Sequence, residues 1–76
     1  MNFEWNEDKN RKNIAKHGVS FADASQIFEG FTLGFVDERN DYGEVREISI
    51  GMIDGIAIVT VVHTDRKGIC RIISAR

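Results

Sequence analysis

The sequence has no proline, a single cysteine and no long hydrophobic run, and the last two of these features each exclude a class of protein. Cys70 alone cannot form an internal disulfide or a cysteine-based zinc site. No stretch reaches the roughly 18 apolar residues that a transmembrane helix needs, and residues 1–8 lack the apolar segment of a secretory signal. We therefore expect a cytoplasmic protein that holds no metal or cofactor and makes no contact with a membrane.

The composition is that of one small folded domain. Hydrophobic residues make up 42% of the 76 positions, and 10 Lys and Arg against 12 Asp and Glu give a net charge of −2. No linker, repeat or low-complexity tract divides the chain, so we expect a single domain over residues 1–76. A chain this short buries only roughly 60% of its unfolded surface. We therefore expect exposed apolar surface that a partner protein or a second copy covers.

The spacing of the apolar residues predicts an α+β domain. Residues 3–5 alternate as in a short strand, and Asn6 then fits the N-cap of a helix that ends at Gly18. Ser20 caps a second helix, which ends at Gly30. The period then changes to two, which predicts four more strands, over residues 31–35, 45–52, 56–63 and 69–74. The order β-α-α-β-β-β-β indicates two N-terminal helices packed on an antiparallel β-sheet.

Two turns set the predicted register of the last three strands. Asp54-Gly55 is typical of a two-residue type I′ hairpin, and residues 64–68 would form a five-residue loop. This register places Arg46 opposite His63, and Arg71 diagonal to His63 at roughly 7–8 Å. We therefore expect these three basic side chains to share one face near one end of the sheet.

Two arginines and a histidine on an otherwise apolar face have two interpretations. In the first they form a phosphate site, because arginine offers planar bidentate donors and histidine exchanges a proton near neutral pH. In the second they only cap the end of the sheet and pair with Glu44 or Glu47. The residues alone leave both interpretations open.

The first predicted helix also carries basic residues. Lys9, Lys12 and Lys16 recur at helical spacing and so share one face, which fits either a nucleic-acid backbone or a solvated surface. Lys16 and His17 lie in the last turn, where the helix dipole favours positive charge whatever their function.

Three groups of residues resemble the BrnT family of bacterial toxins. The first comprises Phe3-Glu4-Trp5-Asn6, Lys9-Asn10, Asn13, the run KHGVSF at residues 16–21 and Ala24; the second Gly43-Glu44-Val45-Arg46 and Ile50-Gly51; the third Val61-Val62-His63-Thr64, Arg66 and the run RIISAR at residues 71–76. The resemblance spans nearly the whole chain, and the two runs together are specific to the family.

The resemblance implies a function that the residues alone do not. Members of the BrnT family are ribonuclease toxins of type II toxin–antitoxin modules, have a fold similar to RelE, and inhibit translation by cleaving RNA. A BrnA antitoxin, which also binds operator DNA, neutralises them, usually in a tetramer of two toxins and two antitoxins. Most members continue past the Ser-Ala-Arg element into a helix rich in Arg and Glu, which the printed sequence lacks, and many have tyrosine at the position of His63.

The implied chemistry is metal-independent RNA cleavage, in which a base activates the 2′-hydroxyl and cations stabilise the phosphorane. We expect Arg46, Arg71 and Arg76 to contact the phosphate, although strand parity places Arg76 on the opposite face from Arg71 unless the strand has ended. The expected acid or base is His63, with His17 and Lys16 as second candidates. Further RNA contacts are expected from Lys9, Lys12, Arg66 and Lys67.

A different class of function stays open. The chain could be a non-catalytic interaction module that only binds an antitoxin, in which case partner binding would survive arginine substitutions that abolish RNA cleavage. A DNA-binding regulator is disfavoured, because neither predicted helix resembles a recognition helix and the net charge is negative. DNA would then be reached only through the antitoxin.

Overall fold

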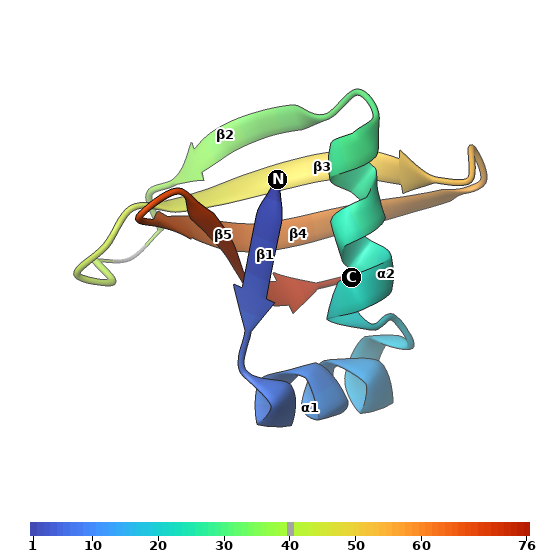
Figure 1. Cartoon of the computed structure of the whole chain (residues 1–76), viewed down its shortest axis with the longest axis horizontal. Helices are drawn as coiled ribbons and strands as arrows, with labels where there is room; N and C mark the ends of the chain where they lie inside the picture. Colours follow the sequence, from blue (N-terminus) through green and yellow to red (C-terminus); the bar gives the residue numbers. More distant parts are fainter. Residues whose placement is uncertain (40) are drawn as a thin grey trace.

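The computed structural model describes residues 1–39 and 41–76 and has an α+β architecture with one five-stranded sheet (Figure 1). Its elements follow one another as β1 (Asn2–Trp5), α1 (Glu7–His17), α2 (Phe21–Ala24), the 3₁₀ segment η1 (Ser25–Glu29), β2 (Leu33–Asp37), β3 (Arg46–Ile53), β4 (Ala57–Arg66) and β5 (Ile69–Ala75). The predicted α+β class with two helices is confirmed, and the second helix finishes in 3₁₀ form. Among the described residues, no helix is long and apolar enough to cross a membrane.

The sheet is mixed, so the prediction of an antiparallel sheet is wrong at one edge. The strand order is β1-β5-β4-β3-β2, and β1 runs parallel to β5 while the other neighbours are antiparallel. The two ends of the sequence therefore lie side by side in the sheet (Figure 1). A parallel neighbour needs a long connection, and here the whole of the chain between β1 and β5 supplies it.

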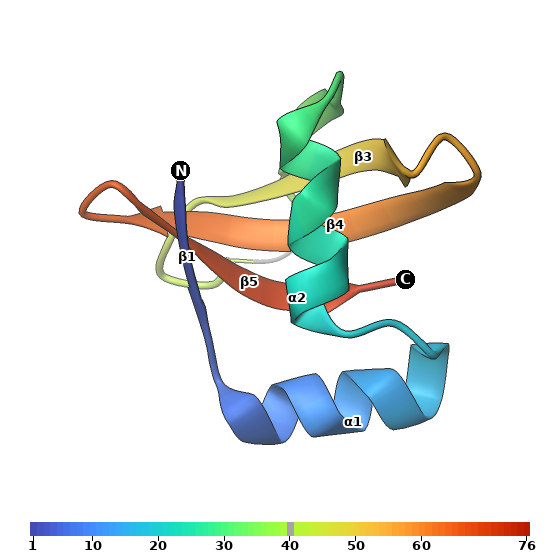
Figure 2. The ribbon, with the colours of Figure 1, turned by 45° about the vertical axis from the view of Figure 1, so that its right-hand side comes forward.

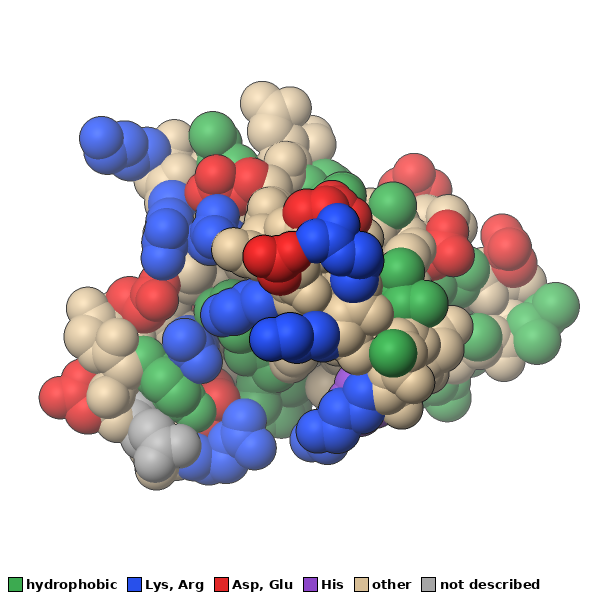
Figure 3. All heavy atoms as spheres, turned by 90° about the horizontal axis from the view of Figure 1, so that it is seen from below, with side chains coloured by type: hydrophobic (Ala, Val, Ile, Leu, Met, Phe, Trp, Pro, Cys, Tyr) green, Lys and Arg blue, Asp and Glu red, His purple; other side chains and the backbone are tan. Residues whose placement is uncertain are grey.

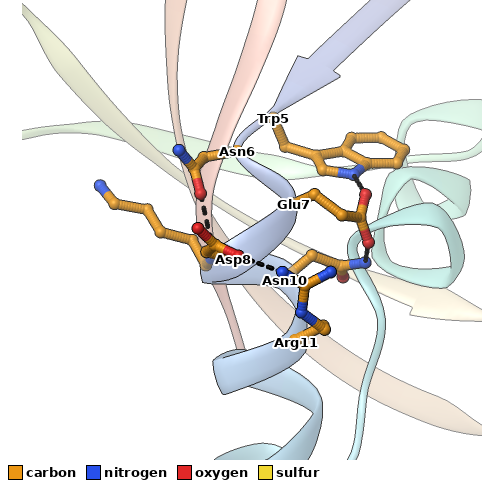
Figure 4. Close-up of polar contacts among 7 residues, drawn as sticks. Trp5, Asn6, Glu7, Asp8, Asn10 and Arg11 are labelled. Carbon is orange, nitrogen blue, oxygen red and sulfur yellow. Dashed lines mark hydrogen bonds and ion pairs between the residues drawn. The ribbon is translucent and has the colours of Figure 1, made fainter.

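Helix α1 begins at a network of polar contacts, drawn in Figure 4. The side chain of Asn6 accepts a hydrogen bond from the Lys9 amide at 3.0 Å, as the sequence predicts for an N-cap. Glu7 accepts hydrogen bonds from Asn10 at 2.9 Å and from Trp5 at 3.3 Å, and these bonds lower the pKa of Glu7. Since Trp5 belongs to β1, the network fixes the direction in which α1 leaves the sheet.

Helix α2 and η1 cross one face of the sheet, as the two ribbon views agree (Figures 1 and 2). The core lies between them and the strands, and its buried members are Phe21, Ala24, Ile27, Val59, Val61, Ile72 and Ala75. Gly51 permits this close approach, because a Cβ there would lie 2.8 Å from the Cβ of Ile27. We call this side the helix-covered face and the other side the open face.

The β3–β4 hairpin differs from the predicted register by one residue. Residues 54–56 form the loop instead of Asp54-Gly55 alone, and Glu47 is the residue that pairs with His63. Because successive residues of a strand point to opposite faces, Arg46 and His63 lie on opposite faces of the sheet. The predicted cluster that joined Arg46 to His63 is therefore wrong.

The β4–β5 connection is tighter than predicted. Strand β4 continues through the expected loop, and residues 67–68, both with positive φ, are the only turn residues. Arg71 consequently pairs with Thr64, instead of facing Val61 as predicted. This change places Arg71, like Arg46, on the face opposite His63.

A β-bulge interrupts β5 beyond this point. Val62 pairs with Ser74 but His63 pairs with Ile72, so Ile73 is an extra residue in β5. The bulge exchanges the faces to which odd and even positions of β5 point. Ser74 therefore lies on the open face, together with Val62.

Candidate functional site

Arg46 and Arg71 project from the open face near the end of the sheet that carries the β4–β5 turn. They belong to one row of side chains that crosses all five strands: Asp37 of β2, Arg46 of β3, Thr64 of β4, Arg71 of β5 and Glu4 of β1. Strand β4 separates the two arginines, so they are two strand spacings, roughly 10 Å, apart. Two arginines whose strands are this far apart suit an extended anion.

The guanidinium of Arg46 is held by an aromatic ring. It lies 3.8 Å above the centre of the Tyr42 ring, in a cation–π contact. The Tyr42 hydroxyl donates to Asp37 at 3.3 Å, which fixes the ring against the end of β2. Among the described residues, the buried Nε of Arg46 has no hydrogen-bond partner. Arg46 is therefore a positioned cation with a donor that is not used within the described protein.

Asp37 organises the loop that brings Tyr42 to Arg46. Its carboxylate accepts two hydrogen bonds of 2.8 Å from the Arg39 guanidinium and one of 3.1 Å from the Arg39 amide. The side chain of Asp37 is only 1% exposed. Hydrogen bonds from Arg39 hold the pKa of Asp37 well below its usual range, so this anchor keeps its charge at all ordinary pH values.

Arg71 and Arg66 each have a glutamate beside them. Arg71 Nη1 lies 3.6 Å from a carboxylate oxygen of Glu4, and Arg66 Nη2 lies 3.7 Å from one of Glu44. The four side chains are between 26% and 52% exposed. Ion pairs so open to water contribute little, so a phosphate can replace either carboxylate at small cost. The expected pairing of Arg71 with Glu44 or Glu47 is not found, because Arg71 pairs with Glu4 and Glu44 pairs with Arg66.

His63 lies in the interior on the helix-covered face and is 9% exposed. Its Nε2 is 2.7 Å from the Ser49 hydroxyl, and its ring meets the ring of Phe28 edge-on at 5.1 Å between centres. Burial lowers the pKa of His63, against a smaller raising effect of Glu47, so the ring is neutral at pH 7. The structure therefore separates His63 from the arginines that it was predicted to assist.

Cys70 lines a small cavity of about 180 Å³ next to His63. Burial, together with the carboxylates of Glu47 and Asp65, raises the pKa of Cys70 to about 11. The thiol therefore stays protonated at neutral pH, and the cavity offers no nucleophile.

Arg76 points to the same face as Arg71; the prediction from strand parity applies only if the strand reaches residue 76, and β5 ends at Ala75. Its amide and carbonyl exchange hydrogen bonds with Thr60 at 2.9 and 2.6 Å, so it pairs with an open-face residue of β4. The bulge at Ile73 places both arginines on one face, because the extra residue reverses the alternation. We call Arg46, Arg66, Arg71 and Arg76 the open-face arginines.

A second basic surface adjoins them. Helix α1 and β5 enclose a groove of about 200 Å³, which we call the lysine groove; it is lined by Lys9, Lys12, Asn13, Lys16, His17, Ile73 and Ser74. Figure 3 views the molecule from the side of α1 and shows Lys and Arg side chains gathered there, with some acidic ones among them. Since Ser74 points to the open face, the groove continues the surface of the open-face arginines.

Hydrogen bonds of the Asn13 side chain hold α1 against β5 at this groove. Its side chain donates to the Ala75 carbonyl at 2.8 Å and to the Val19 carbonyl at 3.0 Å, and accepts from the Ala75 amide at 3.1 Å. Asn10 has a similar role, because its side-chain oxygen accepts a hydrogen bond from the Phe21 amide at 2.9 Å. Both asparagines are buried, so α1 is joined to β5 and to α2 by hydrogen bonds of its polar residues.

No pattern in the sequence singles out Glu4, Asp37 or Tyr42 as site residues. The position of Glu4 depends on the parallel pairing of β1 with β5, which the alternation of residues 3–5 cannot reveal. Tyr42 stands in a polar stretch with no periodicity. Lys67, expected to bind RNA, is an exposed residue of the β4–β5 turn beside Arg66.

Comparison with known proteins identifies the family. A family model described as the ribonuclease toxin BrnT of type II toxin–antitoxin systems matches residues 5–76. The chain belongs to the BrnT family. The crystal structure of the Brucella abortus ribonuclease toxin BrnT is similar, with a TM-score of 0.81 and 31% identity over 100% of this chain and 94% of that chain. A search among curated proteins finds no significant match.

Membership of the BrnT family bears on what the open face could bind. The resemblance in the sequence is confirmed, and a toxin of a type II system has a protein antitoxin as its partner. A ribonuclease toxin must bind a polyanion, and the open-face arginines and the lysine groove supply basic side chains for this despite the net charge of −2.

Proposed function

We propose that this chain is an endoribonuclease toxin with a RelE-like fold, which cleaves RNA without a metal ion and so inhibits translation. The observation that carries the proposal is the pair Arg46 and Arg71, which flank Thr64 on one uncovered face of a sheet. Guanidinium groups bind phosphate oxygens in bidentate fashion and stay charged at every physiological pH. The family to which the chain belongs supplies the reaction class.

In the proposed reaction the scissile phosphate lies between these two arginines. The 2′-oxygen of the ribose attacks phosphorus and the bond to the 5′-oxygen breaks, which leaves a cyclic phosphate and a 5′-hydroxyl. Arg46 and Arg71 stabilise the additional negative charge of the phosphorane. Preorganised donors of this kind contribute about 10²–10³-fold each to the rate. The contact of Arg46 with Tyr42 provides that preorganisation.

Glu4 is the carboxylate best placed to accept the proton of the 2′-hydroxyl. It borders Arg71 at 3.6 Å, so a phosphate on Arg71 would place the neighbouring ribose near Glu4. General bases of this kind contribute about 10²–10⁴-fold. With His63 buried away from the open face, we assign protonation of the 5′-oxygen to His17 in the lysine groove.

The remaining basic residues bind RNA outside the reacting phosphate. We propose that the strand follows the open face from Arg66 past Arg71 to Arg76, and enters the lysine groove at Ser74. Lys9, Lys12 and Lys16 then contact successive phosphates. Lys67 adds a contact at the β4–β5 turn.

We further propose that the antitoxin is a BrnA-like protein, which forms a complex of two toxins and two antitoxins and is the only part that touches operator DNA. The rival function, a module that binds the antitoxin without cleaving RNA, is an outcome of the experiment that follows.

The experiment is RNA cleavage by the purified, antitoxin-free protein in a buffer containing a chelator. We expect cleavage by the wild type, and a loss of about 10²-fold in Arg46→Lys and Arg71→Lys, because lysine keeps the charge but lacks the planar fork. Arg11→Lys is the matched control, since Arg11 is exposed on α1 and pairs with Asp8. Absence of cleavage with intact antitoxin binding would establish the interaction module instead.

A further inference from the structure

The open face carries an apolar groove at the end opposite Arg46 and Arg71. The groove has a volume of about 360 Å³ and is lined by Gly30, Phe31, Leu33, Ile50, Met52 and Ile58. Four of these side chains are more than half exposed: Phe31 at 82%, Leu33 at 60%, Met52 at 54% and Ile58 at 67%. Exposed apolar side chains that gather in one hollow mark an interaction site more often than a plain surface.

The chain segments that form this apolar groove are acidic, and the nearest basic residue is Arg76, which pairs with Thr60 opposite Ile50. Residues 17–38 and 47–65, which include every lining residue, contain no Lys or Arg and seven Asp or Glu. Glu29 directly precedes Gly30, and Asp54 follows Met52 by two residues; both acids are exposed. In Figure 3 the end of the molecule with the β3–β4 hairpin shows acidic and hydrophobic side chains and no basic ones on the face in view. This end is therefore less favourable for RNA than the end that carries Arg46 and Arg71.

We propose that the apolar groove docks an amphipathic segment of the antitoxin, whose apolar side chains enter the groove and whose flanking Lys or Arg residues meet Glu29 and Asp54. The apolar lining of the groove requires apolar side chains in the partner, and the acidic residues Glu29 and Asp54 require flanking basic ones. The proposal rests on family membership, which implies an antitoxin, and does not depend on the ribonuclease activity proposed above.

The toxin then has two separate surfaces on one face of its sheet. RNA occupies the basic end with Arg46 and Arg71, and the antitoxin is anchored at the acidic end with Leu33 and Ile58. Since β3 spans both ends, the lining residues of β3 lie about 13 to 20 Å from Arg46, from the rise of a strand over the four residues to Ile50 and the six residues to Met52. Substitutions at the anchor should therefore weaken antitoxin binding and leave RNA cleavage unchanged.

The test compares two double variants in binding to the antitoxin encoded in the same module. Leu33→Thr with Ile58→Thr removes apolar surface from the groove and keeps or adds β-branched side chains. Val36→Thr with Val45→Thr is the matched control, because these valines are 52% and 65% exposed but do not line the groove. We expect about 10²-fold weaker binding for the groove variant and wild-type binding for the control. The thermal midpoints of both variants establish that they fold.

A second measurement tests the charge of the partner. Synthetic amphipathic helices of about four turns, with leucines on one side and either lysines or glutamates flanking them, serve as probes. We expect only the lysine peptide to bind, and Glu29→Gln with Asp54→Asn to weaken it several-fold at low salt. Asparagine at residue 54 tolerates the positive φ of 54° found there.

Three results would overturn the proposal. The first is wild-type antitoxin binding by the groove variant, and the second is equal binding of the glutamate peptide. The third is a groove variant that changes only the oligomeric state of the toxin, which would assign the apolar groove to a second copy of the chain. RNA cleavage by the same samples reports separately on the proposed activity, so failure of one proposal is distinguishable from failure of the other.

Discussion

Arg71 and Arg76 point to the same face of the sheet although they are five positions apart in one strand segment. An uninterrupted strand would direct them to opposite faces, and the bulge at Ile73 removes that difference. The bulge therefore places Arg71 of β5 and Arg76, which follows β5, on the same face as Ser74 of the lysine groove. Its effect is to extend the basic surface along β5.

Glu4→Gln should lower the cleavage rate by about 10²-fold with little change in RNA affinity, because a proton acceptor is lost while the shape is kept. Single-turnover cleavage and direct RNA binding measure the two quantities separately. Glu44→Gln is the control, since Glu44 forms the corresponding pair with Arg66. Faster cleavage by Glu4→Gln would mean that Glu4 only shields Arg71 from the phosphate.

Replacing Lys12 and Lys16 together by glutamine should weaken RNA binding and flatten its dependence on salt. Each phosphate contact to a single strand contributes about 0.7 to the slope of log affinity against log salt, so the slope should fall by about 1.4. Equilibrium binding from low to moderate salt checks this. Arg11→Gln changes the charge of α1 outside the lysine groove, and an equal effect there would show that only net charge matters.

The stability of the protein should fall as the pH drops below about 6.5, the unperturbed pKa of histidine, because burial lowers the pKa of His63. The unfolded chain then binds a proton that the folded chain does not. Urea unfolding at several pH values measures the slope, which His63→Phe should reduce. An unchanged slope in His63→Phe would assign the pH dependence to another group.

Asn13→Ala should destabilise the fold by about 2–3 kcal/mol, because it leaves the buried Ala75 amide and carbonyl without their partner. Thermal or urea unfolding measures the loss. Lys12→Ala, one position away and exposed, should change stability by less than about 0.5 kcal/mol. A small effect of Asn13→Ala would show that β5 holds its place without α1.

The helices were predictable from the sequence because local chemistry determines them. Asn6 and Ser20 are caps in the structure as predicted, and Gly18 ends α1 with a φ of 75°. The sheet face of each arginine was not predictable, because it depends on single residues in turns. One extra loop residue, Ile56, moves Arg46 to the open face, and a shorter β4–β5 turn moves Arg71 there as well.

The two differences from the predicted register move Arg46 and Arg71 to the same face, so one part of the predicted site is retained. Arg46 and Arg71 still share a face, but His63 is left on the other side among Phe28 and Ser49. A period of two in the sequence shows that the residues of a strand alternate between two faces, but it does not show which face is buried. The parallel pairing of β1, which brings Glu4 to Arg71, leaves no local signal at all.

The position of β5 between β1 and β4 also bears on how the toxin is made. Strand β1 is synthesised first, yet its partner in the sheet begins only at Ile69. A nascent chain therefore emerges from the ribosome with β1 unpaired and without Arg71, and such long-range pairing is completed late in folding. Translation that stops before Ile69 yields a polypeptide with neither the complete sheet nor the arginine pair, so synthesis itself delays the appearance of the toxic form.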